Sequence, residues 1–251
     1  MKFFSIDSPF MVFMNKVANM IILNLLTIFC CLPIFTAGAA ITALYYVTLK
    51  MARGEDPYII KNYFKSFAQN FKQATIIWLM ILVVGVALFF DWKILASMAL
   101  TGTAERVLKG ILIAVILVLV VEAIYVFPVL SRFDNTVKVT IRNALLMAVA
   151  SLPRTVLILM IHFIPVGMIL ASDSMTPVVL LVGIPLVAYL CSMNYIKIFK
   201  PFEPAEEVVA SDEYELPPFM MEEMEAAAKE TAENAEAAED VQAPVEGNSE
   251  N

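Results

Sequence analysis

Residues 110–130 read GILIAVILVLVVEAIYVFPVL, a run of 21 residues in which Glu122 is the only charged side chain. A helix rises about 1.5 Å per residue, so this run is long enough to cross the roughly 30 Å hydrocarbon core of a membrane. A helix also satisfies its own backbone hydrogen bonds, which an extended chain in lipid cannot do. The run therefore predicts a membrane-spanning helix.

Five further apolar runs extend this prediction along the chain. They are residues 17–35, 37–51, 74–92, 155–171 and 177–198. We therefore predict an all-α fold, a polytopic transmembrane helical bundle with six spans. The second run is shorter than the others, which leaves an alternative open. In that alternative Pro33 and Gly38 break a helix into a re-entrant hairpin, which places Lys2 and Lys16 outside and leaves five spans.

Composition and charge divide the chain into two domains. Hydrophobic residues make up 60% of the 251 residues and charged residues 16%. The mean hydropathy of +0.78 excludes an ordinary soluble domain. Residues 1–201, the transmembrane domain, hold 16 Lys or Arg against 8 Asp or Glu, whereas residues 202–251 hold 1 Lys against 16 acidic residues. This acidic low-complexity tail is expected to be disordered and solvated, or to contact a basic surface.

The distribution of basic residues orients the six spans. If both termini are cytoplasmic, 13 Lys or Arg side chains fall inside, and only Lys93, Arg106 and Lys109 fall outside. Residues 52–73 and 131–154 are then cytoplasmic. We also expect the first span to stay uncleaved, because its apolar part exceeds the roughly 7–15 residues of a signal peptide.

An amphipathic helix is predicted in each cytoplasmic segment. In the first, Asp56 and Pro57 form a helix start signal. In the second, Asp134 can cap a helix that ends before Pro153. Such helices lie in the membrane interface, pack under the bundle or dock on a partner. The candidate partner contacts are Lys61, Lys65, Phe67, Arg132, Asp134 and Arg142.

Residues that could carry catalysis or bind a metal are scarce in the sequence. His162 is the only histidine, and the three cysteines, Cys30, Cys31 and Cys191, lie inside predicted spans without metal-ligand spacing. No Gly-rich phosphate-binding loop with its lysine occurs. We therefore expect no enzymatic activity, no cofactor and no nucleic-acid partner.

Glu122 is the residue with the clearest functional weight. A carboxylate in hydrocarbon costs a few kcal/mol unless it is neutralised or paired, so it should face the bundle interior. The candidates for its partner are Asn24, His162, Asn194 and Lys197, each near or inside a span. Two interpretations stay open: Glu122 forms a structural pair, or it lines a path for a proton or a solute.

Three parts of the sequence carry a family resemblance. They are FSIDSPF at residues 4–10, LPIFTAGA at 32–39 continued by TALYY at 42–46 and RGE at 53–55, and SFAQNFKQ at 66–73. With these stretches the chain resembles the YesL family of bacterial integral membrane proteins, a domain of unknown function. The resemblance covers roughly the whole transmembrane domain and leaves the acidic tail outside.

The resemblance implies a multipass protein of the bacterial plasma membrane, with no catalytic residues to carry over. Members often accompany carbohydrate-uptake systems of the ATP-binding-cassette type. An accessory role toward such an importer, through its permease or its ATPase, is therefore the first functional expectation. The second is a small-solute transporter or proton-coupled carrier in its own right, with helix breaks at Pro33 and Gly38 and at Pro165 and Gly167. The sequence leaves the oligomeric state open.

Overall fold

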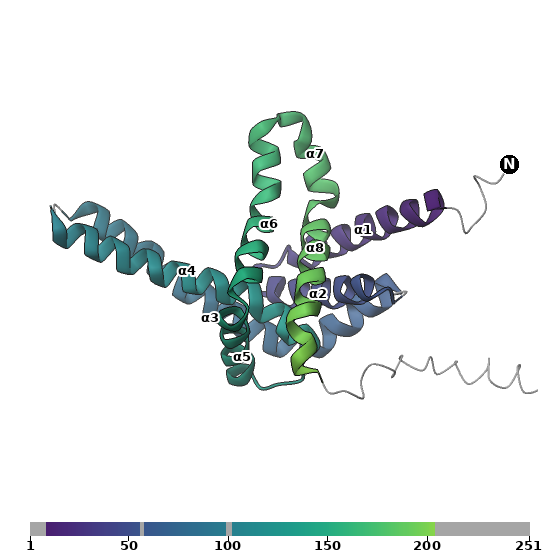
Figure 1. Cartoon of the computed structure of the whole chain (residues 1–251), viewed down its shortest axis with the longest axis horizontal. Coiled ribbons are helices and arrows are strands. Elements are labelled where there is room, and N and C mark those ends of the chain that lie inside the picture. The colour runs from purple at the N-terminus through teal and green to yellow at the C-terminus, as the bar shows by residue number, and fades with distance from the viewer. Residues whose placement is uncertain (1–8, 56–57, 99–101, 204–251) are drawn as a thin grey trace, which may run out of the picture. The chain divides into compact units, whose positions relative to one another are not determined.

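The computed structural model describes residues 9–55, 58–98 and 102–203. Within them every regular element is helical and no strand occurs, which confirms the predicted all-α fold (Figure 1). Six helical stretches are long and apolar enough to cross a membrane. The main helices are α1 (Pro9–Cys31), α2 (Ala37–Arg53), α3 (Ile59–Ser97), α4 (Thr103–Arg132), α5 (Val137–Ala150), α6 (Leu152–Ala171) and α8 (Ile184–Phe199).

Short elements connect some of these helices. A 3-10 turn, η1 (Ile34–Thr36), separates α1 from α2. Between α6 and α8 lie a 3-10 turn η2 (Asp173–Met175), a single turn α7 (Thr176–Val178) and a π-helical segment η3 (Val179–Gly183). A last 3-10 turn, η4 (Lys200–Phe202), follows α8. The acidic tail predicted from residue 202 onward lies, beyond residue 203, outside the described residues.

Helix α3 joins two elements that the sequence predicts separately. The amphipathic segment and the span at residues 74–92 form one continuous helix of 39 residues. Its length is about 58 Å at 1.5 Å per residue, nearly twice the hydrocarbon thickness. The helix begins at Ile59, with Tyr58 before it, whereas the expected start signal at Asp56 and Pro57 lies outside the described residues.

The second predicted amphipathic helix is α5. The sequence predicts where this helix ends but not where it begins. Pro153 lies in the first turn of α6, where its missing N–H is not needed, and so separates the two helices as predicted. The prediction that Asp134 caps α5 is wrong. The helix starts later, with Thr136 at the N-cap, so the Asp134 side chain stands too far upstream to reach the first N–H groups.

Helix α2, the shortest predicted span, lies at the centre of the fold. It packs against α1, α3, α4 and α8. In its membrane-spanning window 61% of the residues are buried, compared with 17% in α4. It is also the least apolar of the six, because its neighbours are protein and its surface carries small and polar residues. Ala39, Ala40, Ala43 and Thr42 are all fully buried.

Gly38 lies where α2 and α3 pack tightly against each other. A β-carbon built at Gly38 would stand 2.6 Å from the Ala74 carbonyl oxygen and 2.6 Å from the Trp78 β-carbon. The Trp78 indole Nε1 donates a hydrogen bond of 2.7 Å to the Ile34 carbonyl oxygen in the turn before α2. A small residue and an indole donor together hold the α1–α2 turn against α3.

The helices meet in an aromatic core. Tyr195 of α8 is fully buried and packs edge-on against Tyr45 of α2 and Tyr125 of α4, with ring centroids 5.7 and 5.3 Å apart. The Tyr195 ring also stacks on Phe199, which in turn packs against Phe133. The α3–α4 pair and the α6–α8 pair both extend from this region (Figure 1).

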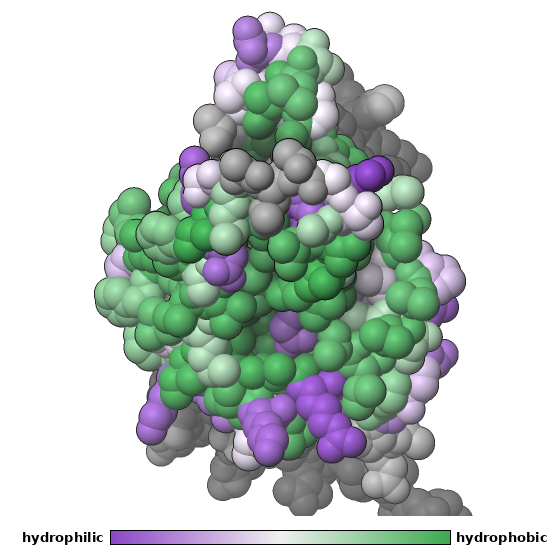
Figure 2. All heavy atoms as spheres, turned by 90° about the vertical axis from the view of Figure 1, so that its left-hand side faces the viewer, coloured by the Kyte–Doolittle hydropathy of each residue, from purple (hydrophilic) through white to green (hydrophobic). Residues whose placement is uncertain are grey.

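Outside this core the spans expose large apolar side chains. Leu170 is 82% exposed, Val83 71% and Phe163 68%. Figure 2 shows a face of the molecule that is apolar over most of its area. Apolar surface of this extent matches lipid and not water, in agreement with six membrane-spanning helices.

Candidate functional site

Glu122, on α4, is half-buried and forms no hydrogen bond or ion pair with any of its four expected partners in the part of the chain that the structure describes. Its Oε1 atom is buried and accepts no hydrogen bond from the described residues. Lys197, one of the expected partners, has an exposed side chain at the end of α8. A buried carboxylate oxygen without a donor is costly in an apolar surrounding, so Glu122 is the least satisfied polar group among the predicted site residues.

Two of the other candidate partners bond within their own helices. His162 Nδ1 lies 2.8 Å from the Ile158 carbonyl oxygen and donates to it. Asn194 Nδ2 donates to the Leu190 carbonyl oxygen at 3.1 Å. Both carbonyls stand four residues upstream of the side chain, the usual back-bonding geometry in a helix. These bonds lie within α6 and within α8, and His162 Nδ1 also lies 3.7 Å from Cys191 Sγ on α8. None of these contacts brings His162 or Asn194 to Glu122.

Asn24 belongs to a different feature, the irregular start of the last span. It lies on α1, is 1% exposed, and its Nδ2 donates a hydrogen bond of 2.7 Å to the Leu181 carbonyl oxygen in η3. Pro185 stands four residues after Leu181 and cannot supply the N–H that an α-helix would direct at this carbonyl. Asn24 therefore joins α1 to the point where the last span departs from α-helical geometry.

Tyr195 repeats this arrangement at α4. Its hydroxyl donates to the Ile124 carbonyl oxygen at 2.9 Å. Pro128, inside α4, stands four residues after Ile124 and likewise offers no N–H. By contrast α6 runs without a break through Pro165, so the helix break expected there is absent. The carbonyl four residues before each proline can be read from the sequence, but the side chain that donates to it cannot.

Other buried hydroxyls also bond between helices. Thr48 Oγ1 on α2 lies 2.9 Å from Ser192 Oγ on α8. The Tyr125 hydroxyl on α4 lies 2.7 Å from Thr155 Oγ1 on α6, which donates to the Ala148 carbonyl oxygen. The described polar groups of the bundle thus connect pairs of helices and form no convergent site.

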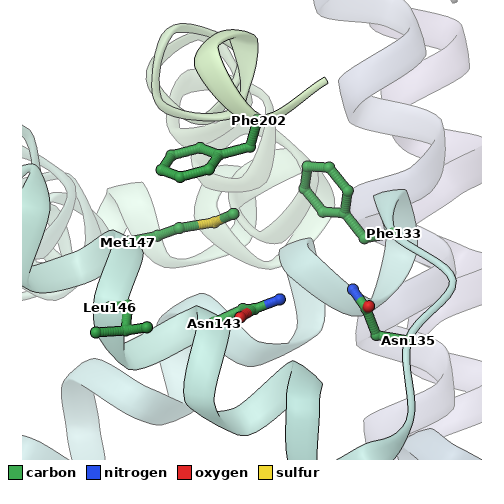
Figure 3. A pocket seen from close by; sticks show the side chains of 6 residues that line it. All are labelled: Phe133, Asn135, Asn143, Leu146, Met147 and Phe202. Carbon is green, nitrogen blue, oxygen red and sulfur yellow. The ribbon is translucent and has the colours of Figure 1, made fainter. Parts of the chain in front are cut away.

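A pocket lies beside α5, away from the middle of the spans. Its volume is about 300 Å³, and α5, the segment after α4 and η4 contribute its walls. Figure 3 shows the Asn135 and Asn143 amides directed toward one another across it. The lining residues are Phe133, Asn135, Asn143, Leu146, Met147 and Phe202. Amide groups within apolar walls can bind a partner by hydrogen bonds and burial but cannot act as acid or base near neutral pH.

The predicted partner contacts fall on two elements. Asp134 and Arg142 are exposed and stand next to Asn135 and Asn143 of the pocket in the chain, and Arg132 is half-buried at the end of α4. The remaining three, Lys61, Lys65 and Phe67, lie on α3. The two lysines are exposed, while Phe67 is half-buried and stacks on Tyr63 with a centroid distance of 6.4 Å. Sequence reasoning did not find the pocket, whose lining comes from segments about 60 residues apart.

Comparison with known proteins supports the resemblance seen in the sequence. Residues 20–92 match DUF624, a family described as protein of unknown function. The chain is also 27% identical over 108 residues to the uncharacterized protein YesL of Bacillus subtilis (strain 168). Over these residues the chain is similar to YesL and to the DUF624 proteins.

The YesL match has limits along both chains. It covers 43% of this chain and spans about half, 49%, of the length of the Bacillus subtilis relative. No solved structure matches the chain. The DUF624 match includes α2 and the Gly38 contact with α3 but ends before the pocket beside α5.

Proposed function

We propose that the protein is an accessory subunit of a carbohydrate importer of the ATP-binding-cassette type, a binding protein and not an enzyme. It resides in the bacterial plasma membrane with both termini and α5 in the cytoplasm, where α5 contacts the permease or its ATPase. The excess of basic residues at that end supports this orientation. The resemblance to YesL proteins supports the class of partner.

The pocket beside α5 is the observation that carries this proposal. It combines apolar walls with the Asn135 and Asn143 amides, and the exposed charges of Asp134 and Arg142 adjoin it in the chain. Exposed Leu146, 54% accessible, adds apolar surface at the pocket. An apolar centre with a polar rim is the composition of a protein-binding surface, in which one inserted side chain supplies most of the affinity.

Co-purification with the importer in mild detergent tests this proposal. We expect permease and ATPase subunits to be retained by the tagged protein, and Leu146→Gln to reduce their recovery several-fold. Leu145→Gln is the matched control, because Leu145 is an equally apolar exposed residue of α5 that does not line the pocket. Absence of importer subunits from the wild-type eluate, or equal recovery with both variants, contradicts the docking role.

A second candidate function, proton-coupled transport, rests on Glu122 alone. Its buried Oε1 without a hydrogen-bond donor is the state expected of a group that binds a transient proton or cation. Glu122→Gln keeps the volume but removes titration. A carrier loses growth on its sugar with normal protein level in the membrane, whereas growth equal to wild type with Glu122→Gln and Glu122→Ala removes this candidate.

A further inference from the structure

One face of α3 changes from basic to apolar along its length. Every residue on it is three or four positions from the next, so their side chains share one side of the helix. From the N-terminal end this lysine face consists of Lys61, Lys65, Ala68, Lys72, Ile76, Leu79, Val83, Val86 and Phe90. Because α3 is unbroken, the lysines and the apolar residues point in the same direction.

The apolar half of the lysine face is directed away from the protein. Val83 is 71% exposed, Phe90 58% and Val86 53%. The opposite side of α3, including Tyr63 and Ala74, is fully buried against the bundle. In a membrane the exposed residues contact lipid acyl chains, so the lysines that continue this face are also directed toward lipid.

The length of α3 places these lysines at the level of the headgroups. Lys72 precedes Ile76 by four residues, about 6 Å along the axis, and Lys65 lies about 10 Å further from the hydrocarbon. The helix is about 58 Å long, whereas a bilayer with its headgroups measures about 40–45 Å, so α3 must tilt or protrude.

A second ridge next to the lysine face favours tilting over protrusion into water. Ile60, Phe64 and Phe71 are 56%, 45% and 36% exposed, and they are also spaced at three or four residues or their multiples. Exposed aromatic and aliphatic side chains beside lysines are typical of helices that lie in the membrane interface. There the apolar ridge enters the acyl boundary and the lysines extend to the phosphates.

We propose that the lysine face of α3 binds the headgroups of anionic phospholipids in the adjacent leaflet. The ammonium groups of Lys65 and Lys72 supply the attraction to the phosphate and to its net negative charge. The bilayer is the occupant that the geometry favours, because a protein partner on this face would have to displace lipid from the continuous apolar surface next to it.

Lipid-dependent quenching of a fluorophore on this face tests the proposal. Ala68→Cys, exposed between Lys65 and Lys72, is labelled in full-length protein whose three native cysteines are replaced. The protein is reconstituted into phosphatidylcholine vesicles with and without phosphatidylglycerol, each lipid in turn carrying a headgroup-level spin label. We expect stronger quenching by spin-labelled phosphatidylglycerol than by spin-labelled phosphatidylcholine at equal amounts, and a loss of this preference at high salt.

Charge variants show whether the lysines cause the preference. Lys65→Gln with Lys72→Gln should lower the preference for phosphatidylglycerol about fivefold per lysine, while Lys65→Arg with Lys72→Arg should keep it. Lys138→Gln with Arg142→Gln, on α5, is the charge-matched control and should also keep it. The Arg variant doubles as a check on folding, since it changes the same positions without removing charge.

Three outcomes overturn the proposal. Equal quenching by both lipids shows that the face has no headgroup preference. Quenching by neither lipid shows that the face meets water or a protein partner. A preference that survives Lys65→Gln with Lys72→Gln, in protein that remains monodisperse, shows that other residues select the lipid.

Discussion

A proline in a helix has no N–H to donate to the carbonyl oxygen four residues upstream. At two such carbonyls in this protein, a side chain from another helix donates a hydrogen bond instead. The Tyr195 hydroxyl donates to the Ile124 carbonyl oxygen, because Pro128, four residues later, has no N–H to offer. Asn24 donates to the Leu181 carbonyl at the equivalent position before Pro185. Each proline thereby creates an attachment point for another helix, so a local defect contributes to the packing of the bundle.

Tyr195→Phe tests this coupling at the level of one hydrogen bond. We expect it to lower the free energy of unfolding by about 1 kcal/mol, the range of interhelical hydrogen bonds in membranes. In a Pro128→Ala background the helix supplies its own donor to the Ile124 carbonyl, so the cost of Tyr195→Phe should fall toward zero. Denaturation in mixed micelles measures both values, and an equal cost in the two backgrounds contradicts the explanation.

Gly38 and Gly85 form a matched pair of helical glycines. Gly38→Ala places a methyl group 2.6 Å from the Ala74 carbonyl oxygen, so we expect a loss of about 1–3 kcal/mol. At Gly85 the nearest atom, from Leu119, is 4.0 Å away. Gly85→Ala should therefore remain within about 1 kcal/mol of wild type. Thermal unfolding of both variants in detergent measures the two effects. Similar losses of stability would show that the room for a methyl group does not determine the cost.

Among the helices, the more apolar of α2 and α4 is the less buried one. Helix α4 is the most apolar span and largely faces lipid, whereas α2 is the least apolar and is mostly surrounded by protein. Lipid-facing positions need large apolar side chains because nothing else covers them. Buried positions accept alanine, threonine and tyrosine, because a neighbouring helix supplies contacts and hydrogen bonds.

Isolated insertion of the two segments tests this difference. Ile34–Arg53 and Thr103–Arg132 are each placed as a test segment in the same host membrane protein. We expect the α4 segment to insert almost completely and the α2 segment in a clearly smaller fraction, since α2 depends on neighbours that the host lacks. Glycosylation of flanking acceptor sites reports the inserted fraction, and equal insertion would refute this dependence.

For the whole molecule, the orientation in the membrane is the property with the most direct test. We expect Ser172→Cys, in the α6–η2 turn, to react with an impermeant thiol reagent in intact cells, and Gln69→Cys on α3 to react only after permeabilisation. Both positions are exposed, so reactivity reports the side of the membrane. Ser66 would be unsuitable, because its side chain is fully buried and would stay silent on either side.

The reverse labelling pattern would place α5 and its pocket outside the cell and exclude contact with a cytoplasmic ATPase. Labelling of both sites in intact cells would contradict the alternation of six spans. A background without Cys30, Cys31 and Cys191 is required, and retention of normal membrane level is the control for folding.

The sequence by itself determined the all-α class, the six spans and the separation of α5 from α6 at Pro153. These properties follow from the solvent and the backbone: hydrocarbon demands about 20 apolar residues per span, and proline interrupts hydrogen bonding locally. The sequence did not predict the start of α5 correctly. No side chain caps this helix, so its first residue depends on how α5 packs against α4.

Only the tertiary structure decided which polar groups meet. Asn24, Asn194, His162 and Glu122 were equally plausible neighbours in the sequence, since each lies near or within a span. In the fold their directions are set by the rotation of each helix about its axis, which depends on contacts such as Gly38 against Ala74. Pairing between helices is a property of these contacts and not of any single segment, so Asn24 reaches Leu181 while Glu122 Oε1 has no donor.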